Sequence, residues 1–299
     1  MPYLQSFCFA SALAEDGVIL NDSRLDMACY AGNNVYPFKV LPQKGVGEIE
    51  LAPITILYGG NGSGKSTMLN IMAEKLALAR TAPFNTTPFM ADYLALCRYT
   101  LCHGVRAIPQ GSAIITSDGV FDYLLDIRAI NDQVGRRREE LFHEYHEVRH
   151  QKEGTPTWQL QSMDDYDELC RRNEIRHRTR SAYTAKRLAN ELPGKSNGES
   201  AFAHFTQRVQ ENALYLLDEP ENSLSATLQA ELAKFILDSA RFYHCQFVIA
   251  THSPFLLSMK GAKIYDLDST PVAVKKWTEL ANVRAYYALF DSHRAEFEI

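Results

Sequence analysis

The stretch LYGGNGSGKST, residues 57–67, decides how the rest of the chain is interpreted. From Gly59 to Ser66 it has the spacing Gly-x-x-x-x-Gly-Lys-Ser. Glycines let a backbone approach an anion closely and adopt dihedral angles that other residues avoid. The stretch therefore predicts a phosphate cradle, built from the backbone N–H groups of Asn61 to Ser66 at the start of a helix.

The flanking residues have the pattern that a P-loop requires. ITILY, residues 54–58, is a short apolar run ending at glycines, which is typical of a buried strand. After the loop, Leu69, Met72, Leu76 and Ala79 recur at helical spacing. The sequence thus predicts a helix from Lys65 to about Arg80, and the order strand, glycine loop, helix indicates a true P-loop.

A P-loop gives each polar group of the stretch a role. Lys65 is predicted to reach the β- and γ-phosphate oxygens, and the Ser66 hydroxyl to ligate Mg²⁺. The cofactors predicted here are therefore ATP and Mg²⁺. The predicted cofactor-binding residues of the loop are Gly59, Asn61, Gly62, Ser63, Gly64, Lys65, Ser66 and Thr67.

A second apolar strand ends in two acids. Residues 213–217, ALYLL, are followed by Asp218, Glu219 and Pro220. This is a Walker B arrangement, in which Asp218 is predicted to hold Mg²⁺ and Glu219 to polarise the water that attacks the γ-phosphate. The alternative, a solvated pair of carboxylates in a loop, is weakened by the P-loop upstream.

The remaining patterns predict an α/β fold with a mostly parallel sheet, because strands alternate with helices. Residues 1–50 are predicted to form short strands and turns, including 36–41, as an antiparallel N-terminal β part. A helix is predicted from about Phe89 to His103. Further strands are predicted at 113–116, 247–251 and 263–268, and further helices at 201–209 and around 228–236.

A highly charged segment, residues 131–192, interrupts this pattern. It is predicted to be a helical subdomain, with a break at Gly154 and Pro156, inserted into a single domain that spans residues 1–299. One interpretation is a pair of solvated helices, because acidic residues balance the arginines. The other is a basic face from Arg171 to Arg187 that contacts DNA, RNA or an acidic partner.

Composition narrows the class of protein. The chain has 299 residues, 46% hydrophobic and 22% charged, and its net charge of −5 argues against non-specific coating of nucleic acid. No apolar run approaches the roughly 20 residues needed to cross a bilayer, and the N-terminus lacks a basic leader. The six cysteines include no Cys-x-x-Cys pair. A cytoplasmic protein without membrane insertion is predicted.

Three motifs follow the P-loop in order: SNGES at 196–200, DEPENSL at 218–224 and THSP at 251–254. They resemble the signature, the Walker B motif with its D-loop, and the switch histidine of ATP-binding-cassette (ABC) ATPases. Over about Leu51 to Asp268, the chain is similar to the SMC/RecF-like and overcoming-lysogeny-like predicted ATPases of that superfamily. A Toprim nuclease domain is not expected, because the segment after His252 is short.

The resemblance implies a head-to-tail homodimer with two ATP molecules between the subunits. Ser196 and the Gly198 amide would contact the γ-phosphate bound by the other subunit, and the loop 223–225 would couple the two sites. His252 would sense the γ-phosphate and join Lys65 and Glu219 as the catalytic residues.

Two positions depart from the family pattern or leave it open. The family expects a Gln after the strand that follows the P-loop helix, whereas here Ser117 and Asp118 follow the strand. Either these two residues replace the Gln or the position is vacant. Tyr36 stands where some ABC ATPases stack an aromatic ring on adenine, but a core or turn tyrosine is the alternative.

The function predicted is an ATPase that acts as an ATP-gated clamp or switch. Its work would lie in nucleic-acid repair or in defence against mobile elements and phage, with nucleic acid or a separate effector protein as partner. The alternative is the nucleotide-binding subunit of an ABC transporter, which the missing Gln and the charged insertion disfavour. A non-hydrolysing ATP-binding scaffold is disfavoured by Glu219 and His252.

Overall fold

The computed structural model describes residues 2–30, 34–80, 82–149, 166–187 and 196–297. The chain divides into two compact units. The core unit comprises Met1–Asp122 and Ser196–Ile299, and the arm unit comprises Tyr123–Lys195. The insertion expected at 131–192 lies within the arm unit, and the expected break at Gly154 and Pro156 lies outside the described residues.

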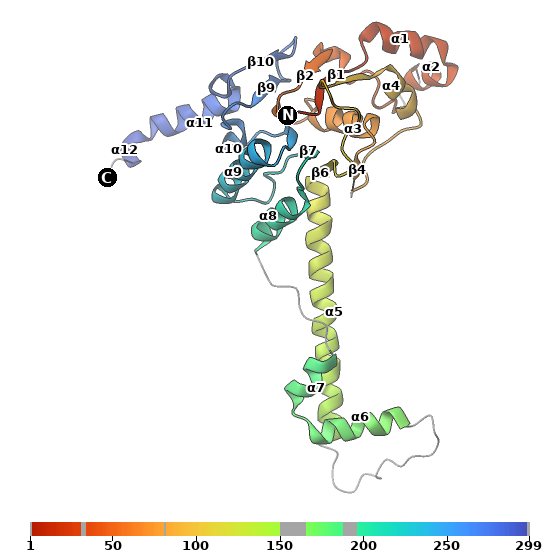
Figure 1. Ribbon diagram of the computed structural model, residues 1–299, viewed down its shortest axis with the longest axis vertical. Helices are drawn as coiled ribbons and strands as arrows, with labels where there is room; N and C mark the ends of the chain where they lie inside the picture. Colours follow the sequence, from red (N-terminus) through yellow and green to blue (C-terminus); the bar gives the residue numbers. More distant parts are fainter. Residues whose placement is uncertain (1, 31–33, 81, 150–165, 188–195, 298–299) are drawn as a thin grey trace. The chain divides into compact units, whose positions relative to one another are not determined.

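The core unit has the predicted α/β fold with a mostly parallel sheet (Figure 1). Its large sheet has seven strands in the order β10-β9-β3-β8-β7-β6-β4, in which only the β10–β9 pair is antiparallel. The strands are β3 (Ile54–Tyr58), β4 (Ala79–Arg80), β6 (Ala113–Thr116), β7 (Leu214–Asp218), β8 (Gln246–Ala250), β9 (Lys263–Asp266) and β10 (Ala273–Val274).

A second sheet of three antiparallel strands forms the predicted N-terminal β part. Its order is β2-β1-β5, with β1 (Leu4–Cys8) in the middle, β2 (Glu48–Glu50) on one side and β5 (Arg98–Leu101) on the other. Gln246 at the start of β8 ties this sheet to the large one, because its side-chain oxygen accepts from the amides of Tyr3 and Leu4.

The helices of the core unit cover the large sheet and bury its apolar strands. All residues of β3 and β8 are buried, as expected for central strands covered on both faces. α3 (Lys65–Lys75) packs on β6, β7 and β8, and α9 (Ala226–Phe242) packs on β8. The carboxyl ends of β3, β7 and β8 meet at one edge, where the loops with the predicted functional residues begin.

Short helices complete the core unit. They are α4 (Met90–Leu96), α8 (Asn197–Arg208), α10 (Pro254–Leu257), α11 (Ala281–Ser292) and α12 (Arg294–Phe297), with 3₁₀ turns at Pro42–Lys44 and Trp277–Glu279. After β10, α11 leads away from the sheet toward the C-terminus (Figure 1). No helix in the described part of the chain is long and apolar enough to cross a membrane.

The prediction of strands and turns alone for residues 1–50 was wrong. Two helices, α1 (Ala12–Asn21) and α2 (Ser23–Tyr30), follow β1. The side chain of Ser11 caps α1 by accepting from the Ala14 amide. Residues 36–41 form turns, not a strand, and Lys39 has a left-handed φ of 64° that an extended strand cannot contain.

Two predicted helices are shorter than expected because strand pairing ends them. α3 stops at Lys75, Ala77 has a φ of 50°, and the next residues form β4, which pairs with β6. α4 stops at Leu96, and residues 98–101 pair with β1 as β5. In both cases a partner strand distant in sequence overrides the local helical pattern.

Glu15 on α1 is a buried acid, and its replacement by Gln is expected to stabilise the protein at alkaline pH. Burial raises the pKa of Glu15 to about 7, although Oε2 accepts from the Lys39 amide at 2.7 Å. The folded state holds the Glu15 proton more tightly than the unfolded state does. The protonated Glu15 side chain therefore contributes to the free energy of unfolding at low pH, and this contribution is lost as pH rises through about 7. Glu15→Gln is expected to raise the free energy of unfolding by about 1–3 kcal/mol near pH 8 and by less near pH 5.

Urea unfolding across this pH range measures the effect, and Glu48→Gln on the exposed edge of β2 is the matched control. A lower free energy of unfolding for Glu15→Gln near pH 8 would contradict the prediction.

The arm unit is helical and has a small core of its own. α5 (Ser117–Arg149) begins in the core unit and continues into the arm, where α6 (Tyr166–His177) and α7 (Arg180–Arg187) follow. Leu141, Tyr145, Ile175 and Tyr183 form the core.

Acidic partners take up several of the arm's basic residues. Glu174 forms ion pairs with Arg178, Lys186 and Arg187 at 2.7–3.2 Å. Glu144 forms an ion pair with Arg171 at 2.9 Å. These ion pairs favour the charge-balanced interpretation of the arm over a continuous basic face.

Candidate functional site

The P-loop is a tight turn between β3 and α3. Gly62 and Gly64 have φ angles of 77° and 95°, which favour glycine. A Cβ on Gly59 would lie 2.5 Å from the Ser63 hydroxyl oxygen, so only glycine fits there. The Gly60 amide donates to both carboxylate oxygens of Asp268, at 3.1 and 2.9 Å. The loop is therefore held in shape by the segment that follows β9, the strand next to β3.

Lys65 lies at the centre of the loop with its side chain 5% exposed. Its ammonium group donates to the carbonyl oxygens of Gly59 at 2.7 Å and Gly60 at 3.1 Å. The Glu219 carboxylate lies 3.8 Å away. A cation held in this way at the N-terminus of α3 makes the loop attractive for an anion.

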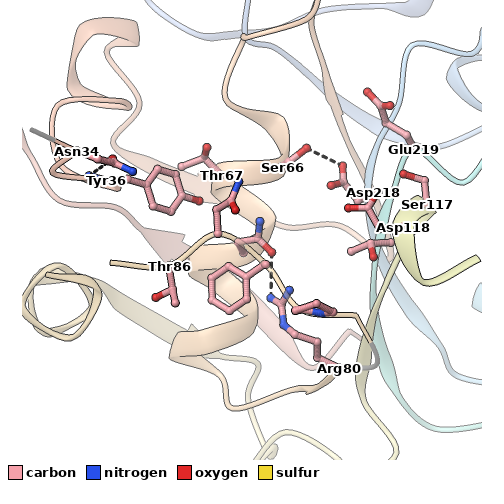
Figure 2. Close-up of a pocket in the computed structure, with 15 residues that line it drawn as sticks. Asn34, Tyr36, Ser66, Thr67, Arg80, Thr86, Ser117, Asp118, Asp218 and Glu219 are labelled. Carbon is pink, nitrogen blue, oxygen red and sulfur yellow. Dashed lines mark hydrogen bonds between the residues drawn. The ribbon is translucent and has the colours of Figure 1, made fainter. Parts of the chain in front are cut away.

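Ser66 and Asp218, the two residues predicted to bind Mg²⁺, are in direct contact. The Ser66 hydroxyl donates to Asp218 Oδ1 at 3.1 Å (Figure 2). Burial raises the pKa of the Asp218 carboxyl to about 6, and the charge of Glu219 adds to this, while the Ser66 hydrogen bond acts in the opposite direction. A divalent cation would offset that desolvation, and a hydroxyl and a carboxylate are oxygen ligands of the kind Mg²⁺ prefers.

Glu219 directly follows β7 in an unusual backbone conformation. Its φ is 47°, and its amide donates to the Ala250 carbonyl on β8 at 2.9 Å. Such a left-handed non-glycine residue persists only where its surroundings hold it, and this is common at functional sites. Asn222 donates to the second carboxylate oxygen at 3.1 Å. The Glu219 side chain is 26% exposed and lines the same pocket as the P-loop residues.

His252 follows β8, and its imidazole lies near Glu219 and Glu221. Its Nδ1 lies 3.9 Å from Glu219 Oε1 and 3.7 Å from Glu221 Oε1. The structure therefore brings Lys65, Ser66, Asp218, Glu219 and His252 together at one edge of the sheet, although their roles stay predictions.

Two adjoining pockets open at this edge. One, of about 320 Å³, is lined by residues 61–67 and Glu219. The other, of about 560 Å³, extends from Ser66, Thr67 and Asp218 to the half-buried Tyr36 (Figure 2). Arg80 and Phe84 line the second pocket as well, with the guanidinium 3.9 Å from the ring centroid.

The two positions left open by the sequence both border the larger pocket. Ser117 and Asp118 begin α5 at the end of β6 and lie near Asp218 (Figure 2). Tyr36 lies in a turn and also reaches the pocket. Replacement of the missing Gln and stacking on adenine stay predictions for these residues.

The signature residues lie apart from the P-loop pockets in a single chain. Ser196 caps α8 through the Glu199 amide, in a reciprocal capping box. A Cβ on Gly198 would lie 3.0 Å from Leu228 and 3.2 Å from the Ser223 carbonyl oxygen, so α8 packs closely on the loop 223–225. Neither Ser196 nor Gly198 lines either pocket.

The residues present fit a nucleotide triphosphate with Mg²⁺. Within the described part of the chain, the amides of Gly62, Gly64, Lys65 and Ser66 have no protein acceptor. They surround a pocket that also contains a buried ammonium group and adjoins a hydroxyl–carboxylate pair. Free amides and a cation suit phosphate oxygens, and the oxygen pair suits a hard cation.

The sequence did not single out three residues that hold this site together. Glu221 accepts from the amides of His252 and Ser253, Asp268 accepts from Gly60, and Gln229 accepts from the Ser253 hydroxyl. Glu221 stands within the motif at 218–224, and Asp268 stands at the end of the predicted strand 263–268. An acid at such a position was the only sign in the sequence that it takes part in the site. Its partner could not be known without the fold.

A segment of 121 residues, from within the arm to the end of α10, matches a known family. Residues 138–258 match the family described as "AAA domain, putative AbiEii toxin, Type IV TA system". The matched residues include the signature, the Walker B strand and the switch histidine, and they begin after the P-loop. No match was found among the curated proteins.

The solved structures that match this chain include two SMC heads and an ATP-binding cassette. The SMC head bound to the C-winged helix domain of ScpA is 14% identical, with 77% of this chain and 92% of that chain covered and a TM-score of 0.37. The SMC head domain from Thermotoga maritima is 13% identical, with 77% and 92% covered and a TM-score of 0.29. A dimeric ATP-binding cassette bound to ADP and phosphate is 14% identical, with 77% and 88% covered and a TM-score of 0.34.

Proposed function

We propose that this chain is an ABC-superfamily P-loop ATPase of the SMC/RecF-like type and that it hydrolyses ATP with Mg²⁺ as a head-to-tail dimer. The observation that carries the proposal is the meeting of Lys65 and Ser66 with Asp218, Glu219 and His252 at one sheet edge. An ATP-gated dimer of this kind would work as a clamp or switch.

The residues divide the chemistry among them. The loop amides and Lys65 bind the phosphates, and Ser66 and Asp218 hold the metal. When bound, Mg²⁺ would supply positive charge to the β- and γ-phosphate oxygens. Glu219 orients and polarises the attacking water, and His252 contacts the γ-phosphate from the side of β8. ATP turnover that requires Mg²⁺ is the direct test.

The signature residues complete the site only from another copy of the chain. Ser196 and Gly198 line neither P-loop pocket of their own subunit, which supports their action across a dimer interface. In a head-to-tail dimer each site takes its P-loop from one subunit and its signature from the other, and closure would exclude water.

Mixing two inactive variants is expected to restore activity. Lys65→Met disables the P-loop, and Ser196→Asp keeps the helix cap but places a negative charge where the γ-phosphate is expected. In a one-to-one mixture, half of the random encounters bring the two variants together, and each such pair has one intact site that can close on ATP. Turnover should therefore recover to roughly a quarter of that of the unmodified protein.

Ser196→Asn retains both the cap and a neutral charge, so the turnover that Ser196→Asp loses beyond Ser196→Asn measures the effect of the added negative charge. If the mixture of Lys65→Met and Ser196→Asp is as inactive as either variant alone, the head-to-tail arrangement is wrong.

The partner is proposed to be nucleic acid or a separate effector protein, in repair or in defence against mobile elements and phage. Turnover measured with duplex DNA, single-stranded DNA and RNA at fixed salt compares these partners. Stimulation by one of them would identify a nucleic-acid partner, and no response to any would favour a protein effector.

A further inference from the structure

Glu221 is the more buried of the two acids that directly follow β7, and the proposed chemistry gives it no role. Its side chain is 5% exposed, compared with 26% for Glu219. A buried carboxylate is costly unless hydrogen bonds compensate for the water it loses. Its contacts therefore show what it is there to hold.

A single oxygen of Glu221 collects three hydrogen bonds from the turn after β8. Oε1 accepts from the Thr251 hydroxyl at 2.6 Å, the His252 amide at 3.0 Å and the Ser253 amide at 3.2 Å. Thr251 and Ser253 are both buried. Three donors from one turn meet on this one buried oxygen, and the Ser253 amide is shared with the Thr251 hydroxyl oxygen at 3.0 Å, so the turn is fixed relative to the end of β7.

The main chain of His252 is held from both sides. Its amide donates to Glu221, and its carbonyl oxygen accepts from the Asn282 side-chain amide at 2.7 Å. Asn282 lies on α11, and its main-chain amide donates to the Tyr58 hydroxyl at the end of β3. With both main-chain groups fixed, the imidazole of His252 starts from a held backbone and lies between Glu221 and Glu219, 3.7 and 3.9 Å from their Oε1 atoms.

Gln229 extends this network to the loop 223–225. The Ser253 hydroxyl donates to Gln229 Oε1 at 2.7 Å, and Gln229 Nε2 donates to the Leu224 carbonyl oxygen at 3.0 Å. The turn with His252, the acid Glu221 and the start of α9 therefore form one hydrogen-bonded body.

We propose that Glu221 is the positioning residue for His252. Its carboxylate oxygen fixes the turn 251–253 so that the imidazole Nδ1 lies 3.9 Å from Glu219 Oε1 and 3.7 Å from Glu221 Oε1 itself. The inference rests on the proposed function, because that function gives His252 its role in turnover.

A double-mutant cycle in ATP turnover tests this inference. Glu221→Ala is expected to lower kcat by a factor on the order of 10 to 100, with KM for ATP changed by less than about threefold because the P-loop is untouched. In a His252→Ala background, the same change should lower kcat by less than about twofold, because the positioned group is already absent. An equal fall in both backgrounds would overturn the proposal.

Glu221→Gln is the conservative variant, since its amide oxygen can accept the same three hydrogen bonds. It should retain kcat within about fivefold of the unmodified protein. A loss as large as that of Glu221→Ala would show that the acceptor oxygen is not what matters. If Glu221→Ala does not fold, Thr251→Val removes one of the three donors, and its smaller loss should likewise vanish in the His252→Ala background.

The NMR signal of the His252 ring gives a readout that is independent of turnover. In protein with labelled histidine, His252→Ala identifies the signal among the nine histidines. The signal should broaden in Glu221→Ala, because the turn is released, and stay sharp in Glu221→Gln, in which loss of the charge 3.7 Å from Nδ1 shifts it without broadening. If the unmodified protein does not hydrolyse ATP, the proposed function fails, while an unchanged ring signal in Glu221→Ala would overturn the positioning role separately.

Discussion

Glu219→Gln is expected to lower ATP turnover by a factor on the order of 10² to 10⁴ without weakening ATP binding. Glu219 borders both pockets and lies 3.8 Å from the Lys65 ammonium group. Gln has the same shape and its oxygen can still accept from Asn222, which donates to Glu219 at 3.1 Å. The change therefore removes the ability to polarise water and leaves the phosphate cradle intact.

A dimer that closes on ATP and cannot hydrolyse it should accumulate in this variant. We expect Glu219→Gln to sediment as a dimer with ATP and Mg²⁺ and as a smaller species without nucleotide. Glu231→Gln, an exposed acid on α9, is the matched control and should behave like the unmodified protein in both assays. Turnover of Glu219→Gln within about twofold of normal would remove Glu219 from the proposed chemistry.

The sequence predicted those parts of the site in which one local pattern contains both the element and the functional residue. β3 was predicted at Ile54–Tyr58 and occurs there, and the glycine loop leads directly into α3. The acids at the end of β7 were found in the same way, because an apolar run stops at a polar pair. Parallel strands then bring their carboxyl ends to one edge, so local patterns placed distant residues together.

The features that depend on a distant partner could not be predicted. β4 and β5 were assigned to helices because their pairing strands lie far away in the sequence. Glu221 stood within the quoted motif at 218–224 and Asp268 at the end of a predicted strand, but neither position revealed its partner. Only the fold shows that Glu221 accepts hydrogen bonds from amides of the turn after β8 and that Asp268 accepts from the Gly60 amide.

The arm shows the same limit for charge. Its arginines and glutamates were visible in the sequence, but two interpretations stayed open. The pairing of Arg178, Lys186 and Arg187 on Glu174 depends on the turn between α6 and α7, which composition does not reveal.

Lys65→Met is expected to act at an earlier step than Glu219→Gln, because it removes the cation that binds phosphate. The Lys65 stem is buried, so the similar length of Met preserves its packing while the charge is lost. Loss of the charged hydrogen bonds to phosphate should cost about 3 kcal/mol, or roughly a 100-fold weaker affinity for ATP. Titration calorimetry with ATP and Mg²⁺ measures this directly.

The two variants should thus separate binding from hydrolysis. Lys65→Met is expected to show weak ATP binding, no turnover and no ATP-dependent dimer, whereas Glu219→Gln should keep its affinity and accumulate the dimer. Lys234→Met, an exposed lysine on α9, controls for the loss of one positive charge. Unchanged ATP affinity in Lys65→Met would mean that the phosphates are bound elsewhere. The hydrogen bonds of Lys65 to Gly59 and Gly60 would then serve only to shape the loop.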